Sequence, residues 1–214
     1  GDYDADGITS ISVLSLFLKK LDVDFFYYIP NRLKEGYGLN IEAIEKIRVK
    51  GAKLLITVDC GITNIMEVDN LVKSGIDVII TDHHQCGNIL PDALAIINPN
   101  RINDDYPFNG LAGVGVAFKL VEALANTLGI SIDYDEILPI VALGTVADVM
   151  PLVGENRIIV KNGLKLMESS NNNGIRALLE ITGLIGKCLS AYHMGFVLGP
   201  RLNAAGRLGP NTKP

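Results

Sequence analysis

The sequence lacks long apolar runs, an excess of positive charge and any pattern of paired cysteines. No run approaches the roughly 18 apolar residues of a membrane span, and no basic segment before an apolar core indicates a signal peptide. The formal net charge of -5 argues against a chain that coats duplex DNA through a broad basic face. We therefore expect a cytoplasmic protein with no membrane partner.

Cysteine is scarce, and Cys60, Cys86 and Cys188 lie far apart in the sequence. They predict neither a disulfide framework nor a zinc knuckle, and we expect reduced thiols. By contrast, 48% of the 214 residues are hydrophobic, which is enough for a substantial core. Because no repeat and no shift in composition divides the chain, we treat residues 1–214 as one domain.

Patterns typical of helices and strands alternate along the chain and predict an α/β domain, with a mostly parallel sheet flanked by helices. The predicted helices are 8–21, 41–49 with Asn40 as N-cap, 64–73, 114–128, 158–167 and 175–184. The predicted strands are 25–29, 53–58, 76–81 and 96–97.

The first seven residues, Gly-Asp-Tyr-Asp-Ala-Asp-Gly, place Asp2, Asp4 and Asp6 directly before a predicted helix. Carboxylates this close repel one another unless a cation lies among them. The N-terminus of a helix also favours carboxylates and bound phosphate. Alone, this pattern fits a solvated acidic turn as well as a metal or phosphate site.

Polar residues also follow two of the predicted strands. Asp59 follows one strand, and Asp82-His83-His84 follow the next. A parallel strand, helix and strand unit brings both carboxyl ends to one sheet edge, where ligands bind in open parallel sheets. We therefore expect ligand or catalytic roles for Asp59, His83 and His84, and an ordinary structural role for His193.

Asp148 follows an almost wholly apolar stretch, where an unpaired acid is costly, so it is a further candidate ligand. Arg32, Arg201 and Arg207 lie on predicted loops among glycines and other small residues, which let a phosphate approach. The length and paired glycines of the loop at 31–40 favour function for Arg32. For Arg201 and Arg207 the spacing fits a solvated turn equally well.

The candidate set combines many carboxylates with two imidazoles. Its members are Asp2, Asp4, Asp6, Asp59, His83, His84 and Asp148. Oxygen ligands with a minority of nitrogen suit Mn²⁺ or Mg²⁺ better than a structural zinc. So many acids favour two ions, a common arrangement for phosphoester cleavage, and a second histidine would hydrogen-bond the phosphate or leaving group. The residues predict metal-dependent phosphoester hydrolysis.

Three other interpretations fit parts of this pattern. A calcium EF-hand fails because the twelfth position counted from Asp2 is Val13 rather than Glu. A haloacid-dehalogenase-type phosphatase would need Thr or Val where Ile8 stands, and it has no use for Asp82-His83-His84. A noncatalytic nucleotide-binding module stays open, although binding alone would not need acids on four separate loops.

The chain resembles the DHH phosphoesterase superfamily in the order and setting of four motifs. These are Asp4-Ala5-Asp6-Gly7, Asp59, Asp82-His83-His84 and Asp148. Longer stretches resemble the superfamily's branch of single-strand-specific DNA exonucleases: Asn31-Arg32 with Glu35-Gly36-Tyr37-Gly38, residues 111–118, 142–149 and 199–207. The resemblance covers essentially the whole chain.

This resemblance implies a Rossmann-like DHH domain and a nuclease with two Mn²⁺ or Mg²⁺ ions. Such an enzyme removes nucleotides from the 5′ end of single-stranded DNA in DNA repair and recombination, with a helicase or single-strand-binding protein as a further partner. The implied metal ligands are Asp4, Asp6, Asp59, His83 and Asp148, with Asp59 bridging the ions. His84 would face the phosphate and Asp2 would support the site. The implied substrate contacts are Arg32, Arg201, Asn203 and Arg207.

The sequence departs from the superfamily pattern at both ends. The chain does not include the histidine that often precedes the position of Gly1, the DHH-associated C-terminal domain or an oligonucleotide-binding fold. We therefore expect a fragment that lacks the strand leading into Asp2 and binds DNA poorly by itself. The alternative within the superfamily is a phosphoesterase for small substrates: short oligonucleotides, cyclic dinucleotides or pyrophosphate.

Overall fold

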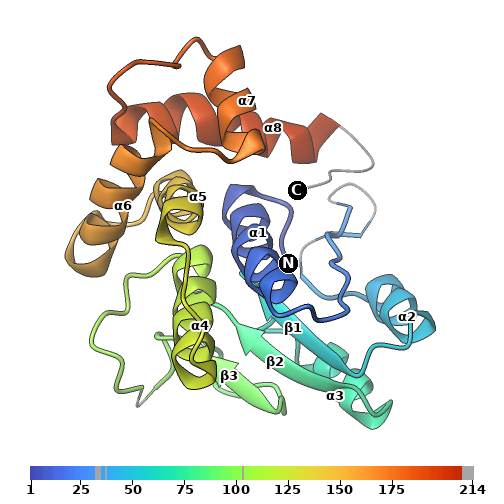
Figure 1. The fold of residues 1–214 in the computed structure, drawn as a ribbon. Coiled ribbons are helices and arrows are strands. Elements are labelled where there is room, and N and C mark those ends of the chain that lie inside the picture. Colours follow the sequence, from blue (N-terminus) through green and yellow to red (C-terminus); the bar gives the residue numbers. More distant parts are fainter. Residues whose placement is uncertain (32–34, 37, 103, 209–214) are drawn as a thin grey trace.

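In the part of the chain that the structure describes, a three-stranded parallel sheet carries helices on both faces (Figure 1). The computed structural model describes residues 1–31, 35–36, 38–102 and 104–208. The strands are β1 (Leu54–Val58), β2 (Asp77–Thr81) and β3 (Ala95–Ile97). The helices are α1 (Ala5–Lys20), α2 (Ile41–Val49), α3 (Ile65–Lys73), α4 (Gly113–Leu128), α5 (Tyr134–Ala147), α6 (Gly154–Met167), α7 (Asn173–Ile181), the π-helix η1 (His193–Leu198) and α8 (Gly199–Leu208).

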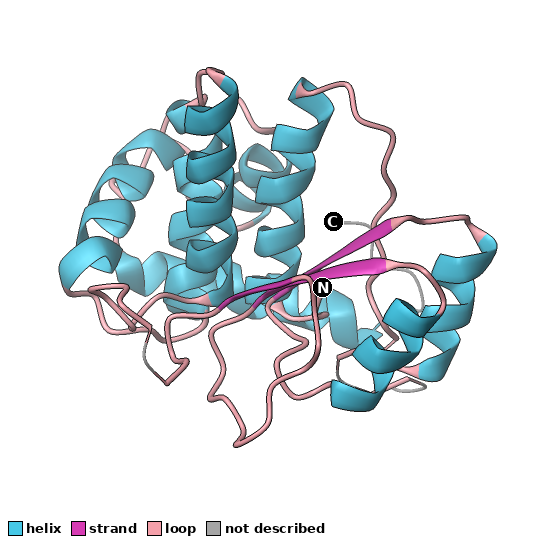
Figure 2. Cartoon of the chain, turned by 90° about the horizontal axis from the view of Figure 1, so that it is seen from below, coloured by secondary structure: helices cyan, strands magenta, loops and turns pink. Residues whose placement is uncertain are grey.

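The strands lie in the order β1-β2-β3, and both pairs are parallel. At their carboxyl ends Val58 pairs with Thr81, and Thr81 pairs with Ile97. The predicted parallel sheet is therefore confirmed, and the residues after β1 and β2 emerge side by side. Figure 2 shows the strands between the helices of the two faces.

Each face of the sheet carries its own apolar core. Helices α1 and α4 cover one face, with α5 packed against both, and their buried residues form the larger cluster with Val58 of β1. Helices α2 and α3 cover the other face, where Val78 and Ile80 of β2 belong to one cluster with Val68 and Leu71 of α3. Burial on both faces explains why the strands are almost wholly apolar.

Local signals determine several helix ends. Asn40 caps α2 as predicted, since its side-chain oxygen accepts a hydrogen bond from the Ala43 amide at 2.8 Å. Helix α4 ends at Gly129, whose φ of 67° is left-handed and suits glycine. Among the helices described, none is long and apolar enough to cross a membrane.

Two sequence predictions are wrong. Residues 25–29 form no strand, because within the described chain β1, β2 and β3 pair only with one another. The segment is held by the amino group of Gly1, which donates to the Tyr28 carbonyl at 3.0 Å. Arg201 lies in a helix rather than a loop, because α8 continues directly from the π-helix η1.

Candidate metal centre

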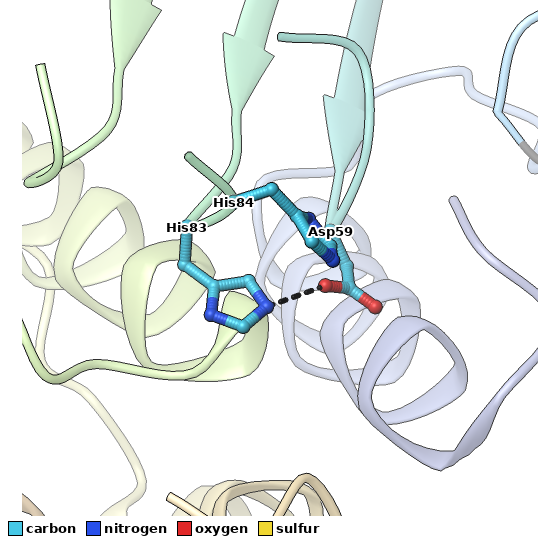
Figure 3. Close-up of side chains that lie close together, drawn as sticks. All are labelled: Asp59, His83 and His84. Carbon is cyan, nitrogen blue, oxygen red and sulfur yellow. Dashed lines mark ion pairs between the residues drawn. The ribbon is translucent and has the colours of Figure 1, made fainter. Parts of the chain in front are cut away.

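The polar residues predicted as a site converge at the carboxyl edge of the sheet. Asp59 directly follows β1, and His83 and His84 follow β2 (Figure 3). The start of α1 contributes Asp4 and Asp6 to the same place. Segments far apart in the sequence thus meet at one edge because parallel strands expose their carboxyl ends together.

The acidic loop is fixed by the start of α1. Asp4 is the N-cap and accepts a hydrogen bond from the Gly7 amide at 3.0 Å. A Cβ atom on Gly7 would lie 2.5 Å from the carbonyl oxygen of Asp2, so no side chain fits there. Asp2 is buried and accepts a hydrogen bond from the amide of Tyr3 at 2.7 Å.

Asp6 joins α1 to the N-terminus of α4. Its two carboxylate oxygens accept hydrogen bonds from the amides of Gly113 and Val114, at 2.7 and 2.8 Å. A Cβ atom on Gly113 would lie 2.5 Å from Oδ1 of Asp59, so glycine is needed for this close approach. The positive end of α4 therefore supports a buried acid beside Asp59.

His83 lies at the centre of the acids. Its Nε2 atom lies 3.2 Å from Oδ1 of Asp59, 3.6 Å from Oδ2 of Asp6 and 3.7 Å from Oδ2 of Asp148. This nitrogen is buried and makes no hydrogen bond of acceptable geometry within the described residues. A buried nitrogen that faces three carboxylate oxygens fits a shared divalent cation better than a hydrogen-bond network.

Three overlapping groups of side chains have ligand atoms within 4.8 Å of one another. They are Asp59 with His83 and His84, Asp6 with His83 and Asp148, and Asp2 with Asp4 and Asp59. Asp59 belongs to two groups, as expected of a bridging ligand, and His83 also belongs to two. The donor set of carboxylate oxygens and imidazole nitrogen fits Mn²⁺ or Mg²⁺.

Crowding and burial disfavour the charged forms of the inner acids. Burial and the neighbouring Asp148 carboxylate raise the pKa of Asp6 to about 8. Burial and then Asp6 raise the pKa of Asp59 well above its usual range. Burial is also the main cause that raises the pKa values of Asp2 and Asp148 to about 6. A bound cation would reverse this preference by compensating the negative charge.

The two histidines have different environments. Burial, followed by the adjacent His84, lowers the pKa of His83 to about 4, so its ring is neutral. His84 is half-exposed, and its Nδ1 donates to Oδ1 of Asp82 at 2.7 Å. This hydrogen bond raises the pKa of His84 against the opposing effect of burial. His83 therefore suits a ligand, and His84 suits a proton donor at the rim.

Sequence reasoning did not assign a role to Asp82, although it marked the Asp82-His83-His84 triplet. Besides His84, the Asp82 carboxylate binds the amides of Ile62 and His83, at 3.0 and 2.8 Å. Burial favours the neutral acid, but the hydrogen bonds from His84 and Ile62 outweigh it and lower the pKa of Asp82. An acid directly before two histidines at a strand end was the available signal.

Two asparagines were also missed. Nδ2 of Asn98 donates to the carbonyl of His84 at 2.9 Å, and Nδ2 of Asn100 donates to the carbonyl of His83 at 2.5 Å. Both follow β3, the third strand of the same edge, so they fix the backbone of the histidine pair. The Asn-Pro-Asn sequence after the 96–97 strand could have indicated them.

The structure separates the four predicted substrate contacts. Oδ1 of Asn203 accepts from the Ala5 amide at 2.7 Å, between Asp4 and Asp6, so Asn203 lies at the centre. Arg201 is exposed and its Nη1 donates to the Val197 carbonyl, within its own helical segment. Arg32 and the side chain of Arg207 lie outside the described part of the chain.

The sequence profile of the DHH family, N-terminal domain, matches residues 1–145, which is more than half of the chain. The chain belongs to the DHH family. The RecJ single-stranded-DNA-specific exonuclease of Bacillus subtilis is 47% identical over 97% of this DHH chain and 26% of its own length. The RecJ of Thermus thermophilus is 42% identical over 100% of this chain and 31% of its own.

A solved structure agrees with this assignment. The crystal structure of exonuclease RecJ bound to manganese superposes with a TM-score of 0.88 and 41% identity, over 98% of this DHH chain and 52% of the other. The predicted α/β fold and the DHH resemblance are thereby confirmed. The chain spans about a quarter to two fifths of the curated RecJ relatives it matches.

Proposed function

We propose that residues 1–214 act as one catalytic domain of a metal-dependent exonuclease that shortens single-stranded DNA from its 5′ end. The observation that carries this proposal is the position of His83 Nε2, buried among the carboxylates of Asp59, Asp6 and Asp148. The single-strand-specific exonucleases to which the chain is similar support the choice of substrate.

Two divalent cations, Mn²⁺ or Mg²⁺, fit this donor set. The residues that would hold them are Asp4, Asp6, Asp59, His83 and Asp148, with Asp59 shared and Asp2 in support. When bound, such ions activate the attacking water and neutralise charge on the phosphoryl group. The RecJ structures that were solved with manganese and with magnesium support this assignment.

His84 is the group of this chain best suited to meet the substrate. Its ring is half-exposed, its Nδ1–H is directed by Asp82, and its pKa is raised. When the ring is protonated, Nε2 donates to a phosphate oxygen or protonates the leaving oxygen. Asp82 holds the tautomer and the orientation, so it acts through His84.

The biological setting is part of the same proposal. An enzyme that shortens single strands serves DNA repair and recombination, where a helicase or a single-strand-binding protein supplies or protects its substrate. We also propose a cytoplasmic location. We assign DNA-phosphate contacts to Arg32, Arg201 and Arg207, and a contact near the scissile phosphate to Asn203, which already binds the acidic loop.

The test uses the intact protein with Mn²⁺ and single-stranded oligonucleotides labelled at either end. We expect mononucleotides to be released from the 5′ end, and duplex DNA to resist. Asp59→Asn should abolish release, whereas Asp77→Asn, an exposed acid at the opposite end of β2, should not. Turnover of only dinucleotides or pyrophosphate would favour the small-substrate alternative. Binding without turnover of any substrate would favour the noncatalytic module.

A further inference from the structure

Val149 has an unusual backbone conformation directly after Asp148. Its φ is 58°, in the left-handed region, and the residue is 87% exposed. A β-branched residue is strained in this region, and an exposed valine gains little from burial that would offset the strain. Asp148 contributes a carboxylate to the centre, 3.7 Å from His83. The strained residue therefore stands at the edge of the site.

The left-handed conformation is required by the end of α5. The Val149 amide donates to the Val146 carbonyl at 3.1 Å, and the Met150 amide donates to the Thr145 carbonyl at 3.3 Å. These two bonds form a Schellman motif, in which glycine is the usual residue at the position of Val149. Glycine would satisfy the same backbone without strain. The isopropyl group is thus present at a position where backbone strain by itself favours glycine.

Hydrogen bonds from a buried side chain hold the segment that follows Val149. Nδ2 of buried Asn156 donates to the Pro151 carbonyl at 3.0 Å and to the Gly110 carbonyl at 2.6 Å. Strain of this kind persists where the surroundings over-determine it, and it concentrates at functional sites. Asn156 therefore fixes the segment that carries both Asp148 and Val149.

We propose that Val149 is a specificity residue that packs its isopropyl group on the apolar face of a nucleoside next to the scissile phosphodiester. This inference rests on the proposed function. The centre already carries several acids, so a side chain that contacts the substrate without adding charge avoids repulsion from the phosphates. Apolar contact with the sugar and base is also tolerant of sequence, because every nucleoside offers such a face.

Asp22 provides a matched control within the same chain. It follows α1 with a φ of 54°, and its amide donates to the Lys19 carbonyl at 3.1 Å. The Val23 amide donates to the Leu18 carbonyl at 3.3 Å, which completes the same motif. The intervening helix of 16 residues places Asp22 about 24 Å from the acidic loop. Substitutions at Asp22 therefore report backbone strain without any contact at the site.

The experiment compares V149G, V149A and D22G in the intact protein loaded with Mn²⁺. V149G and D22G should both raise the unfolding midpoint, V149G by about 2 to 4 °C. Only V149G and V149A should raise KM for single-stranded DNA, by about 5- to 10-fold. An enzyme that becomes more stable while it binds substrate less well would support a contact role, since relief of backbone strain alone would raise the midpoint and leave KM unchanged, as expected for D22G.

An abasic scan locates the contact and can refute it. In the wild type, removing the base at one position near the 5′ end should raise KM by a similar factor, and V149G should be insensitive to that change. If V149G and the abasic change raised KM independently at every position, so that their factors multiplied, the inference would be overturned. A lower unfolding midpoint for V149G would also overturn it. If the wild type does not digest single-stranded DNA, the proposed function itself fails, which is a separate result.

Discussion

The inner cluster of acids around His83 and the exposed edge around His84 use the same type of side chain in opposite ways. His83 has 10% of its side chain exposed and faces three carboxylates, whereas His84 has 45% exposed and binds Asp82. Burial lowers the pKa of His83 to about 4, while the hydrogen bond to Asp82 raises the pKa of His84. The environment therefore favours the neutral ring of His83 and the protonated form of His84.

The largest expected effect separates the two histidines. His83→Ala should lower activity about 10³-fold and weaken Mn²⁺ binding, because it removes one of the proposed metal ligands. His84→Ala should lower activity about 10²-fold but leave Mn²⁺ affinity nearly unchanged. Isothermal titration calorimetry with Mn²⁺ and single-turnover rates on DNA would measure both. Equal losses of Mn²⁺ affinity in the two variants would contradict the comparison.

Asp82→Asn should lower activity about 10²-fold while the ring of His84 remains present. The carboxylate favours the cationic ring, so its loss should bring the pKa of His84 down. The cation would then be lost at a lower pH, and the alkaline limb of the pH–rate profile should move in that direction. An unchanged limb would show that His84 does not act as the proton donor.

The buried acids around His83 should lower the free energy of unfolding of the metal-free protein as pH rises. From about pH 6.5 to 8, Asp6 keeps a proton in the folded state that it has already lost when unfolded, so the free energy of unfolding falls. His84, whose pKa is raised, acts in the same direction. Mn²⁺ at 100 times its Kd should add about 2.7 kcal/mol.

Calorimetric scans in EDTA and in Mn²⁺, at pH 6.5 and pH 8, would check this behaviour. Mn²⁺ should raise the unfolding midpoint by about 5 to 10 °C, since about 1 kcal/mol corresponds to 2 to 4 °C at this size. A midpoint in EDTA that rises between pH 6.5 and pH 8 would show that folding does not raise the pKa of Asp6.

The smallest expected effect concerns Asn156, which supports the segment after Asp148. Asn156→Ala should cost about 2 kcal/mol, because a buried side chain would be removed and the carbonyls of Gly110 and Pro151 would each lose a donor. Asn162 is exposed on the same helix and donates to the Ile158 carbonyl one turn away, so Asn162→Ala should change stability by less than about 0.5 kcal/mol. Urea unfolding of both variants would measure the difference, and equal costs would argue against the support role.

Much of the fold could be predicted because local patterns and packing agree. The apolar runs before Asp59 and Asp82 become β1 and β2, and Asn40 caps α2. The run at 25–29 is also apolar, but within the described residues no strand pairs with it, so it stays irregular. Apolar composition indicates burial or an extended chain, whereas a strand also requires a hydrogen-bonded neighbour.

The sequence by itself determined which groups form the centre: carboxylates on separate loops and a histidine pair at a strand end, placed together by the rule that parallel strands share an edge. Only the tertiary structure decided their roles. In the folded chain His83 is buried against Asp59, and His84 forms a hydrogen bond with Asp82. Val149 is strained and exposed beside Asp148. These assignments depend on distances of a few ångströms between segments far apart in sequence, because burial and nearby charge set the protonation state of each group.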